Sequence, residues 1–348
     1  MIQGSAALPT LQSGSSRPYL LLLIGSSVLS GLLLVAFCFW TNFDLATTGR
    51  SLMRLHPVDF LEILLLMAVN SFLAGEKWRL VTARLGSPDG GTPPRQLCFA
   101  LSAIGTALGQ FLPAQISTAL ARSAGTRAFG GPVLRDGLGA TMIEQLFDFF
   151  VAALLGCASL LVIVMAADSA AWALWSVAAI VAGLALCVVA GRLAASGSGR
   201  LASLAARIPP GRMRKLLSSV TEPRLIASEM TLRLFVLSLL RFVVLVLIGA
   251  VVANALSLDL PLWHLAAAFP FAVLAIALAL TPGALGIGEF TFSWALVALG
   301  TPLQVAGQWV IATRILVVAT AALLGFAGTA IVVLSHRSRR VRGARQAR

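Results

Sequence analysis

The sequence TPGALGIGE, residues 281–289, interrupts an apolar run that extends from residue 263 to residue 300. Pro282, Gly283 and Gly286 favour a break in the helix, and a break in mid-membrane frees backbone groups that hydrocarbon cannot hydrogen-bond. Such a break is tolerated only where protein or a water-filled cavity surrounds it. The stretch therefore predicts a re-entrant hairpin, in which the chain enters the membrane and returns to the same side.

A second apolar segment, residues 97–118, is also broken. It contains Gly105, Gly109 and Pro113, so we expect a second re-entrant hairpin here. Gly105 and Gly109 also form a GxxxG pattern, which is typical of helices that pack closely.

The composition assigns the whole chain to the membrane. Its 348 residues are 58% hydrophobic and 11% charged, with a mean hydropathy of +0.93, whereas a soluble globular chain is about half apolar and a quarter charged. Apolar stretches of about 20 residues are long enough to cross the roughly 30 Å hydrocarbon layer. We interpret six stretches as full crossings: residues 19–40, 58–80, 139–166, 171–191, 232–255 and 304–334.

The expected fold is thus all-α, a polytopic helical membrane protein with six spans and two re-entrant hairpins. A single transmembrane domain covers residues 19–335, between an N-terminal tail (1–18) and a basic C-terminal tail (336–348). Residues 58–166 and 232–334 each contain a span, a broken hairpin and a span, in mirror directions. Inverted repeats of this kind are the architecture of secondary transporters, which bind their substrates near the midplane between the repeats.

The charge distribution predicts the orientation. The chain has 26 Lys and Arg against 13 Asp and Glu, and the excess lies mainly in the loop 192–231 and in the C-terminal tail. Positive-inside bias and attraction to anionic headgroups explain both clusters, so no nucleic-acid partner is expected. We predict that both termini are cytoplasmic at the inner (plasma) membrane, with residues 120–137 inside and 256–262 outside. The loop 41–57, with Arg50 and Arg54, is out of step with this rule.

Motifs of soluble enzymes are absent from the sequence. The four cysteines lie in apolar segments without CxxC spacing, the three histidines are far apart, and no nucleotide-binding pattern occurs. We therefore expect neither a metal site nor a cofactor.

Ionisable side chains inside the apolar segments are the candidate functional residues. Each costs about 2.5–3.5 kcal/mol at the centre of a span, so each needs a partner or a role. Six side chains qualify: Arg122, Glu144, Asp148, Arg241, Glu289 and Arg314. In one interpretation they pair with one another and clamp the two repeats together. In the other, arginines face a cavity and hold an anionic headgroup with their planar, always-charged guanidinium.

Two of these groups suggest proton coupling. Glu144 and Asp148 are four residues apart, so they share a helix face at about 6 Å, and like charges in low dielectric favour protonation of one of them. If the pair only stabilises, replacing both carboxylates with amides should be tolerated. Glu289, in the first turn after the second break, either complements the helix dipole or serves a ligand.

At these residues the sequence resembles the flippase-like transmembrane family, the membrane part of lysylphosphatidylglycerol synthases, which also occurs as stand-alone proteins. The second break is similar to the family's Pro-Gly-Gly-x-Gly-x-x-Glu signature. Further elements resemble its other motifs: Gly300-Thr301-Pro302, Leu112-Pro113-Ala114 with Arg122, Glu144 with Asp148, Arg314, and Glu76-Lys77-Trp78-Arg79. The resemblance covers roughly residues 20–335. It implies a lipid-translocating membrane domain and does not imply the aminoacyl transfer that the fused proteins perform.

The first hypothesis is therefore a translocator (flippase) that moves a polar lipid or lipid-linked intermediate across the inner membrane. The expected site comprises the six ionisable residues with Pro113, Pro282, Gly283 and Gly286 at the breaks. The alternative is an intramembrane enzyme, or the partner of a lipid-biosynthesis enzyme, in glycolipid or lipid modification, with Glu144 or Asp148 as acid or base. A third hypothesis is a scaffold without transport. The expected partners are membrane lipids, and the sequence leaves the oligomeric state open.

Overall fold

The computed structural model describes residues 17–41, 44–85, 92–127, 129, 134–166, 228–279 and 281–346. The expected span 171–191 and all but the last residues of the basic loop 192–231 lie outside them. Within the described residues the regular elements are helices, which agrees with the predicted all-α class. They are α1 (Arg17–Trp40), α2 (Leu45–Met53), α3 (Pro57–Leu85), α4 (Arg95–Leu108), α5 (Ala114–Arg127), α6 (Leu134–Ala166), α10 (Ser228–Ala255), α11 (Leu262–Leu278), the short 3₁₀ helix η2 (Pro282–Ala284), α12 (Ile287–Ala298) and α13 (Leu303–Gln346).

Four of these helices are long and apolar enough to cross a membrane. They contain residues 57–84, 137–161, 229–255 and 303–337, in α3, α6, α10 and α13. Shorter apolar helices cover residues 25–40 and 262–277. The protein is thus a multi-pass membrane protein. Both broken segments form pairs of short helices, α4 with α5 and α11 with α12. The first pair is interrupted at Gly109 and Pro113 and the second at Pro282, Gly283 and Gly286, whereas Gly105 lies inside α4.

The loop 41–57 contains a helix that the sequence analysis did not predict. Asp44 caps α2, because its side chain accepts a hydrogen bond from the backbone N–H of Ala46 at 2.9 Å. Hydrogen bonding to Thr47 holds the pKa of the Asp44 carboxyl below its usual range, so the cap stays ionised at neutral pH. Arg50 and Arg54, which were out of step with the charge rule, lie in and directly after this short helix.

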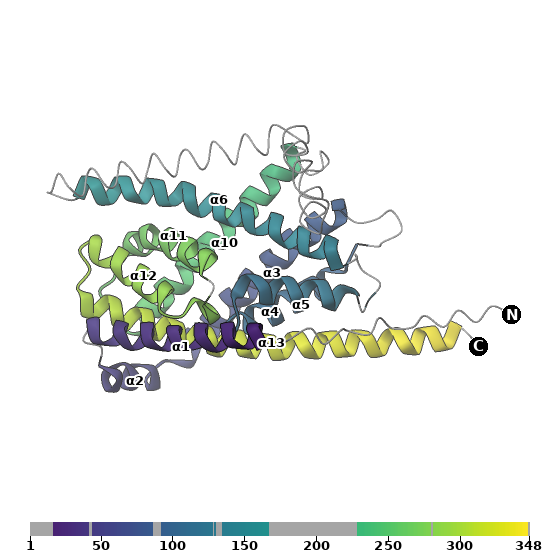
Figure 1. Ribbon diagram of the computed structural model, residues 1–348, viewed down its shortest axis with the longest axis horizontal. Coiled ribbons are helices and arrows are strands. Elements are labelled where there is room, and N and C mark those ends of the chain that lie inside the picture. The colour runs from purple at the N-terminus through teal and green to yellow at the C-terminus, as the bar shows by residue number, and fades with distance from the viewer. Residues whose placement is uncertain are drawn as a thin grey trace.

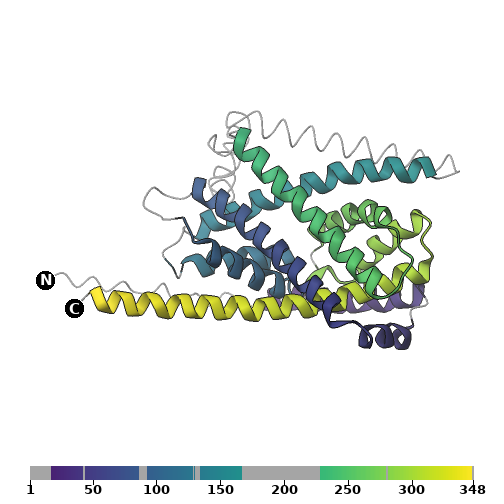
Figure 2. The ribbon, with the colours of Figure 1, turned by 180° about the vertical axis from the view of Figure 1, so that it is seen from behind.

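The two hairpins occupy opposite ends of the helix bundle. In Figure 1, α4 and α5 lie in the right half and α11 and α12 in the left half. Seen from behind, α3 and α10 cross the bundle next to each other, and α13 extends well beyond the other described helices (Figure 2). Helix α4 packs most extensively against α13, and α11 packs against α6. Each hairpin is therefore supported by the long helix that ends the other half of the chain.

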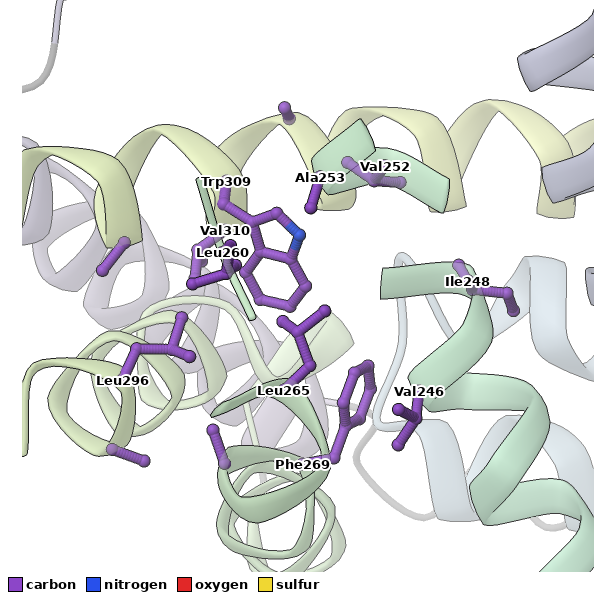
Figure 3. Close-up of a cluster of buried hydrophobic side chains, with 14 of the residues drawn as sticks. Val246, Ile248, Val252, Ala253, Leu260, Leu265, Phe269, Leu296, Trp309 and Val310 are labelled. Atoms are coloured by element: carbon purple, nitrogen blue, oxygen red, sulfur yellow. The ribbon is translucent and has the colours of Figure 1, made fainter. Parts of the chain in front are cut away.

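Most buried apolar side chains gather where α10, α11, α12 and α13 meet. Trp309 is fully buried there, with Leu265 and Phe269 around its indole (Figure 3). Its ring N–H donates to the carbonyl of Gly249 at 2.9 Å. A Cβ atom on Gly249 would lie 2.9 Å from both the Phe269 and the Trp309 rings. Glycine at this position thus allows α13 and α11 to approach α10 closely.

A similar link occurs in the first half of the chain. Trp78 of α3 is fully buried, and its indole N–H donates to the carbonyl of Gly137 in α6 at 3.2 Å. The predicted close packing of the GxxxG pattern is also present: a Cβ on Gly105 would lie 2.9 Å from the Cα of Thr118. The α4 and α5 helices therefore pack almost backbone to backbone.

Candidate functional site

The two helix breaks meet each other inside the bundle. The backbone N–H of Gly283 donates to the carbonyl of Leu112, in the break of the first hairpin, at 3.1 Å. Gly283 has a φ of +59°, and a Cβ there would lie 2.5 Å from the carbonyl oxygen of Gln110 and against the guanidinium of Arg314. Both the left-handed conformation and the close approach require glycine. Pro113 begins the return helix of the first hairpin, where its carbonyl accepts from Ile116 at 3.0 Å.

Arg314 and Glu289 stabilise the second break. The Nη2 atom of Arg314 donates to the carbonyl of Gly283 at 2.8 Å, and its Nε lies 3.7 Å from Oε1 of Glu289. The other carboxylate oxygen of Glu289 accepts from the backbone N–H of Gly286 at 2.7 Å. Glu289 therefore caps the start of α12, as expected for a carboxylate at a helix N-terminus, and it also faces the arginine.

A second group of charged side chains joins α3, α5, α6 and α10. We call it the charge cluster, and it consists of Lys77, Arg122, Glu144, Asp148 and Arg241. Arg122 forms an ion pair with Glu144, and each side chain is only 3% exposed. The Nε of Arg122 also donates to the hydroxyl of Ser102 in α4 at 3.1 Å. This pair lies at the buried end of the cluster.

Asp148 and Arg241 form the accessible end of the charge cluster. They pair with each other and are 23% and 21% exposed. The Nζ of Lys77 also donates a hydrogen bond to Asp148, and Arg241 lies 3.6 Å from Oε1 of Glu144. The Nε of Arg241 donates to Asn70 at 3.1 Å. Arg241 thus contacts both carboxylates of α6, and Arg314 contacts Glu289, as expected for arginines within apolar helices.

The six ionisable residues identified from the sequence are three arginines and three acids, but the charge cluster itself is not balanced. Two carboxylates face three cationic side chains, which leaves one positive charge in surplus. Each carboxylate contacts a guanidinium directly, so repulsion between Glu144 and Asp148 is offset. Each of the two carboxylates of α6 therefore has a cationic partner of its own. Replacing both carboxylates with amides would remove the anionic partners of all three cations, which makes this double replacement unfavourable.

Lys77 is the member of the cluster that sequence reasoning missed. The sequence analysis named it only as part of the Glu76-Lys77-Trp78-Arg79 element, but its side chain is 0% exposed and donates to the backbone carbonyl of Glu144 at 3.2 Å. The signal was present in the helical spacing: Ile63, Met67, Asn70 and Lys77 are separated by four, three and seven residues, which places them on one face of α3, and all four are buried. Its position on that face could have shown that Lys77 points into the bundle.

The described residues show no group of three or more His, Cys, Asp and Glu side chains that could hold a metal ion. They do form an open groove between α1 and α12, with a volume of about 340 Å³. Trp40, Phe290, Thr291 and Trp294 line it. Trp40 stacks on Phe290, with ring centroids 5.4 Å apart. The Thr291 hydroxyl donates to its own helix at 2.8 Å, so the groove presents mainly apolar surface.

Comparison with known protein families gives one match. Residues 22–325 match the family described as the lysylphosphatidylglycerol synthase TM region. The match includes both helix breaks and every member of the charge cluster. No curated protein and no solved structure matches the chain.

Proposed function

This chain belongs to the lysylphosphatidylglycerol synthase TM-region family, and we propose that it translocates a polar lipid or lipid-linked intermediate between the leaflets of the inner membrane. The observation that carries the proposal is the charge cluster. It has one positive charge in surplus, and its Arg241–Asp148 end is partly exposed. A surplus positive charge within apolar helices is costly unless it has a role. Binding an anionic group of a lipid would balance it.

The packing of the helices supports inverted repeats. We propose that α3, the α4–α5 hairpin and α6 correspond to α10, the α11–α12 hairpin and α13. Under this correspondence the contact of α4 with α13 is equivalent to the contact of α11 with α6, and both are among the most extensive in the bundle. The hairpins also lie at opposite ends (Figure 1). These features fit re-entrant hairpins that enter from opposite faces, six spans and cytoplasmic termini.

The contact between the two breaks fits a barrier between the leaflets. Hydrogen bonds between Gly283 and Leu112 and between Arg314 and Gly283 close this region. Buried side-chain oxygens of Gln110, Thr281 and Thr313 have no hydrogen-bond partner among the described residues. Unsatisfied buried oxygens near such a contact favour the presence of water or a polar ligand. We propose that the headgroup passes here when the two breaks separate.

The proposed mechanism replaces water around the headgroup with fixed protein charges. Moving a charged group into hydrocarbon without a partner costs many kcal/mol. Arg241 offers a planar donor fork for a phosphate or carboxylate, and Asp148 must release part of that fork when the ligand binds. The acyl chains remain in the apolar phase, against the outer surfaces of the helices. Because the ligand takes the place of Asp148 at the guanidinium, Arg241 keeps an anionic partner at every stage.

A proteoliposome assay tests this function. Acyl-labelled NBD-phosphatidylglycerol and zwitterionic NBD-phosphatidylcholine are incorporated, and external dithionite reports how fast the inner-leaflet label becomes accessible. We expect wild type to move the anionic lipid faster, and Arg241→Gln to lose most of that activity. Arg233→Gln, an exposed position on the same helix, is the matched control and should behave as wild type. Wild-type protein that moves neither lipid would contradict the proposal, and a modified lipid product would favour the intramembrane enzyme.

A further inference from the structure

We infer that Lys77 carries the coupling proton of this protein. Its Nζ atom is charged when an anionic headgroup occupies the Arg241–Asp148 end of the charge cluster, and neutral when the site is empty. This inference rests on the proposed function, because the proton on Nζ compensates the negative charge of the headgroup that the same site binds. Lys77 takes the role of proton carrier that the sequence analysis gave to Glu144 or Asp148, because guanidinium groups balance the charges of both carboxylates.

The hydrogen bonds of Lys77 fit a neutral amine. Its side chain is fully buried, and its Nζ donates to one oxygen of Asp148 and to the backbone carbonyl of Glu144. Among the described residues these are its two acceptors. A neutral amine has two N–H donors, whereas an ammonium has three. The geometry thus satisfies the neutral form completely and leaves one N–H of the charged form for a ligand or water.

The charge arithmetic identifies the same atom. Arginine does not lose its proton in proteins, so Arg122 and Arg241 remain charged in every state. Arg122 balances Glu144, and Arg241 balances Asp148, each by a direct contact. The remaining charge belongs to Lys77, which is the only one of the three cations that can become neutral. Loss of its proton makes the empty cluster neutral, and one anionic headgroup balances the cluster when Lys77 is charged.

The charged groups around Lys77 come from three neighbouring helices. Among the described residues, α6 contributes Glu144 and Asp148, α10 contributes Arg241, and α5 contributes Arg122 through its pair with Glu144. On α3 itself, Glu76 is engaged by Arg79, and by Arg95 of α4 at 3.4 Å. The charged group that α13 places within the bundle, Arg314, faces Glu289. Asp148 is therefore the acid in direct contact with the Lys77 Nζ.

Asp148 also provides the route for the proton. One of its oxygens contacts Nζ, and its side chain is 23% exposed. A hydronium ion transfers a proton to an oxygen of Asp148 and becomes water, and that O–H then breaks as a new N–H bond forms on the lone pair of Nζ. The carboxylate is restored, and the net change is one proton transferred from hydronium to Lys77. Release of the headgroup reverses the same steps.

Linkage makes the effect measurable. If the anionic headgroup binds the charged form of Lys77 more tightly, the headgroup promotes protonation and protonation promotes binding by the same factor. Because one proton is involved, headgroup affinity falls by at most about ten-fold per pH unit as the pH rises. A site with a permanently charged cluster would show no such slope.

Nuclear magnetic resonance can observe the proton directly, because the sequence contains two lysines, Lys77 and Lys215. In Lys215→Arg protein labelled with ¹⁵N-lysine, Lys77 gives the only lysine side-chain signal. The protein is titrated in neutral detergent from about pH 5 to about pH 10, with and without dihexanoyl-phosphatidylglycerol. We expect a neutral signal at the upper end without lipid, and recovery of the charged signal when the anionic lipid is added. Dihexanoyl-phosphatidylcholine is the matched control and should have a much smaller effect. A Lys77 signal that stays charged throughout, with or without lipid, would overturn the inference.

Proteoliposomes test the consequence for transport. With a pH gradient, wild type should produce an asymmetric distribution of NBD-phosphatidylglycerol between the leaflets. Lys77→Met keeps two guanidiniums against two carboxylates, so it should fold and yet lose the response to the gradient. Lys77→Arg, with a fixed charge, should lose it as well. An unchanged response in either variant would contradict the inference.

The two proposals fail separately. If wild type moves lipid but Lys77 stays charged, the coupling role is wrong and the translocator stands. If Lys77 takes up a proton with the anionic lipid while wild type moves no lipid, the translocator is wrong and the proton-linked anion site stands. If a Lys77 variant does not fold, the nuclear magnetic resonance titration still decides, because it retains Lys77.

Discussion

The backbone N–H of Gly283 donates to the carbonyl oxygen of Leu112 at 3.1 Å, and this hydrogen bond joins the breaks of two hairpins that are far apart in the sequence. A break within a membrane leaves backbone groups without helical partners. Here each break supplies a partner for the other, and Arg314 satisfies the carbonyl of Gly283. The interruption of one hairpin is therefore stabilised by the interruption of the other.

This contact predicts a large difference between two glycine substitutions. Gly283 and Gly300 both have positive φ values, +59° and +92°. A Cβ on Gly283 would clash with the backbone of Gln110, whereas one on Gly300 meets nothing within 4 Å. Gly300→Ala should cost only the backbone penalty of about 1–2 kcal/mol. Gly283→Ala should lower the unfolding temperature in detergent much further and abolish lipid movement. Equal effects of the two variants would contradict the contact between the breaks.

The surplus charge predicts an order of stability for single neutralisations in the cluster. At a pH low enough for Lys77 to be charged, Glu144→Gln leaves three cations against one carboxylate, whereas Arg122→Gln leaves two against two. Both break a buried pair, which costs about 3–5 kcal/mol. Glu144→Gln should be the more destabilising by thermal unfolding. Glu229→Gln in the exposed pair with Arg233 is the control, with an effect below about 1 kcal/mol. A reversed order would show that the surplus charge is not positive.

Removing both carboxylates should be worse than removing either. In Glu144→Gln/Asp148→Asn the three cations of the cluster retain no anionic partner, so we expect a protein that does not accumulate in folded form. Fluorescence-detected size-exclusion chromatography measures this directly. Adding Lys77→Met to the double variant removes one of the uncompensated charges and should recover part of the folded peak. Wild-type-like behaviour of the double variant would restore the expectation drawn from sequence alone.

The two indole hydrogen bonds should contribute similarly to the two halves of the protein. Trp78→Phe and Trp309→Phe each remove a buried hydrogen bond to a glycine carbonyl, which is worth about 1 kcal/mol. Trp263→Phe changes an exposed side chain and serves as the control. We expect the first two variants to lower the unfolding temperature and the third to leave it unchanged. A change only in one half would show that the two links are not equivalent.

Cysteine labelling tests the proposed topology of the hairpins. Arg95 and Arg127 lie at the two ends of the α4–α5 hairpin, and Pro261 and Pro302 flank the α11–α12 hairpin. All four positions are exposed. In a cysteine-free background, a membrane-impermeant maleimide should label the first two from the cytoplasmic side and the last two from the opposite side. Labelling of Arg95→Cys and Arg127→Cys from different sides would mean that the hairpin crosses the membrane.

The sequence predicted the breaks well, because proline and glycine act locally and an apolar run of known length makes their effect visible. It also identified the ionisable residues of the candidate site, apart from Lys77. It could not predict that these residues divide into two groups, because the pairing depends on how α4 packs on α13 and α11 on α6. Lys77 was missed because it lies near the end of the expected span 58–80, next to the charged residues Glu76 and Arg79, although the buried face of α3 extends past it.

Each hairpin packs against a long helix from the other half of the chain, and this arrangement also determines when the protein can finish folding. Helix α4 packs most extensively against α13, which is the last helix among the described residues. The helices from α1 to α12 therefore leave the ribosome before the first hairpin can acquire its main support. Until then its polar break lacks the partner that Gly283 supplies. The first hairpin must thus remain in the membrane without these contacts until α13 has been synthesised.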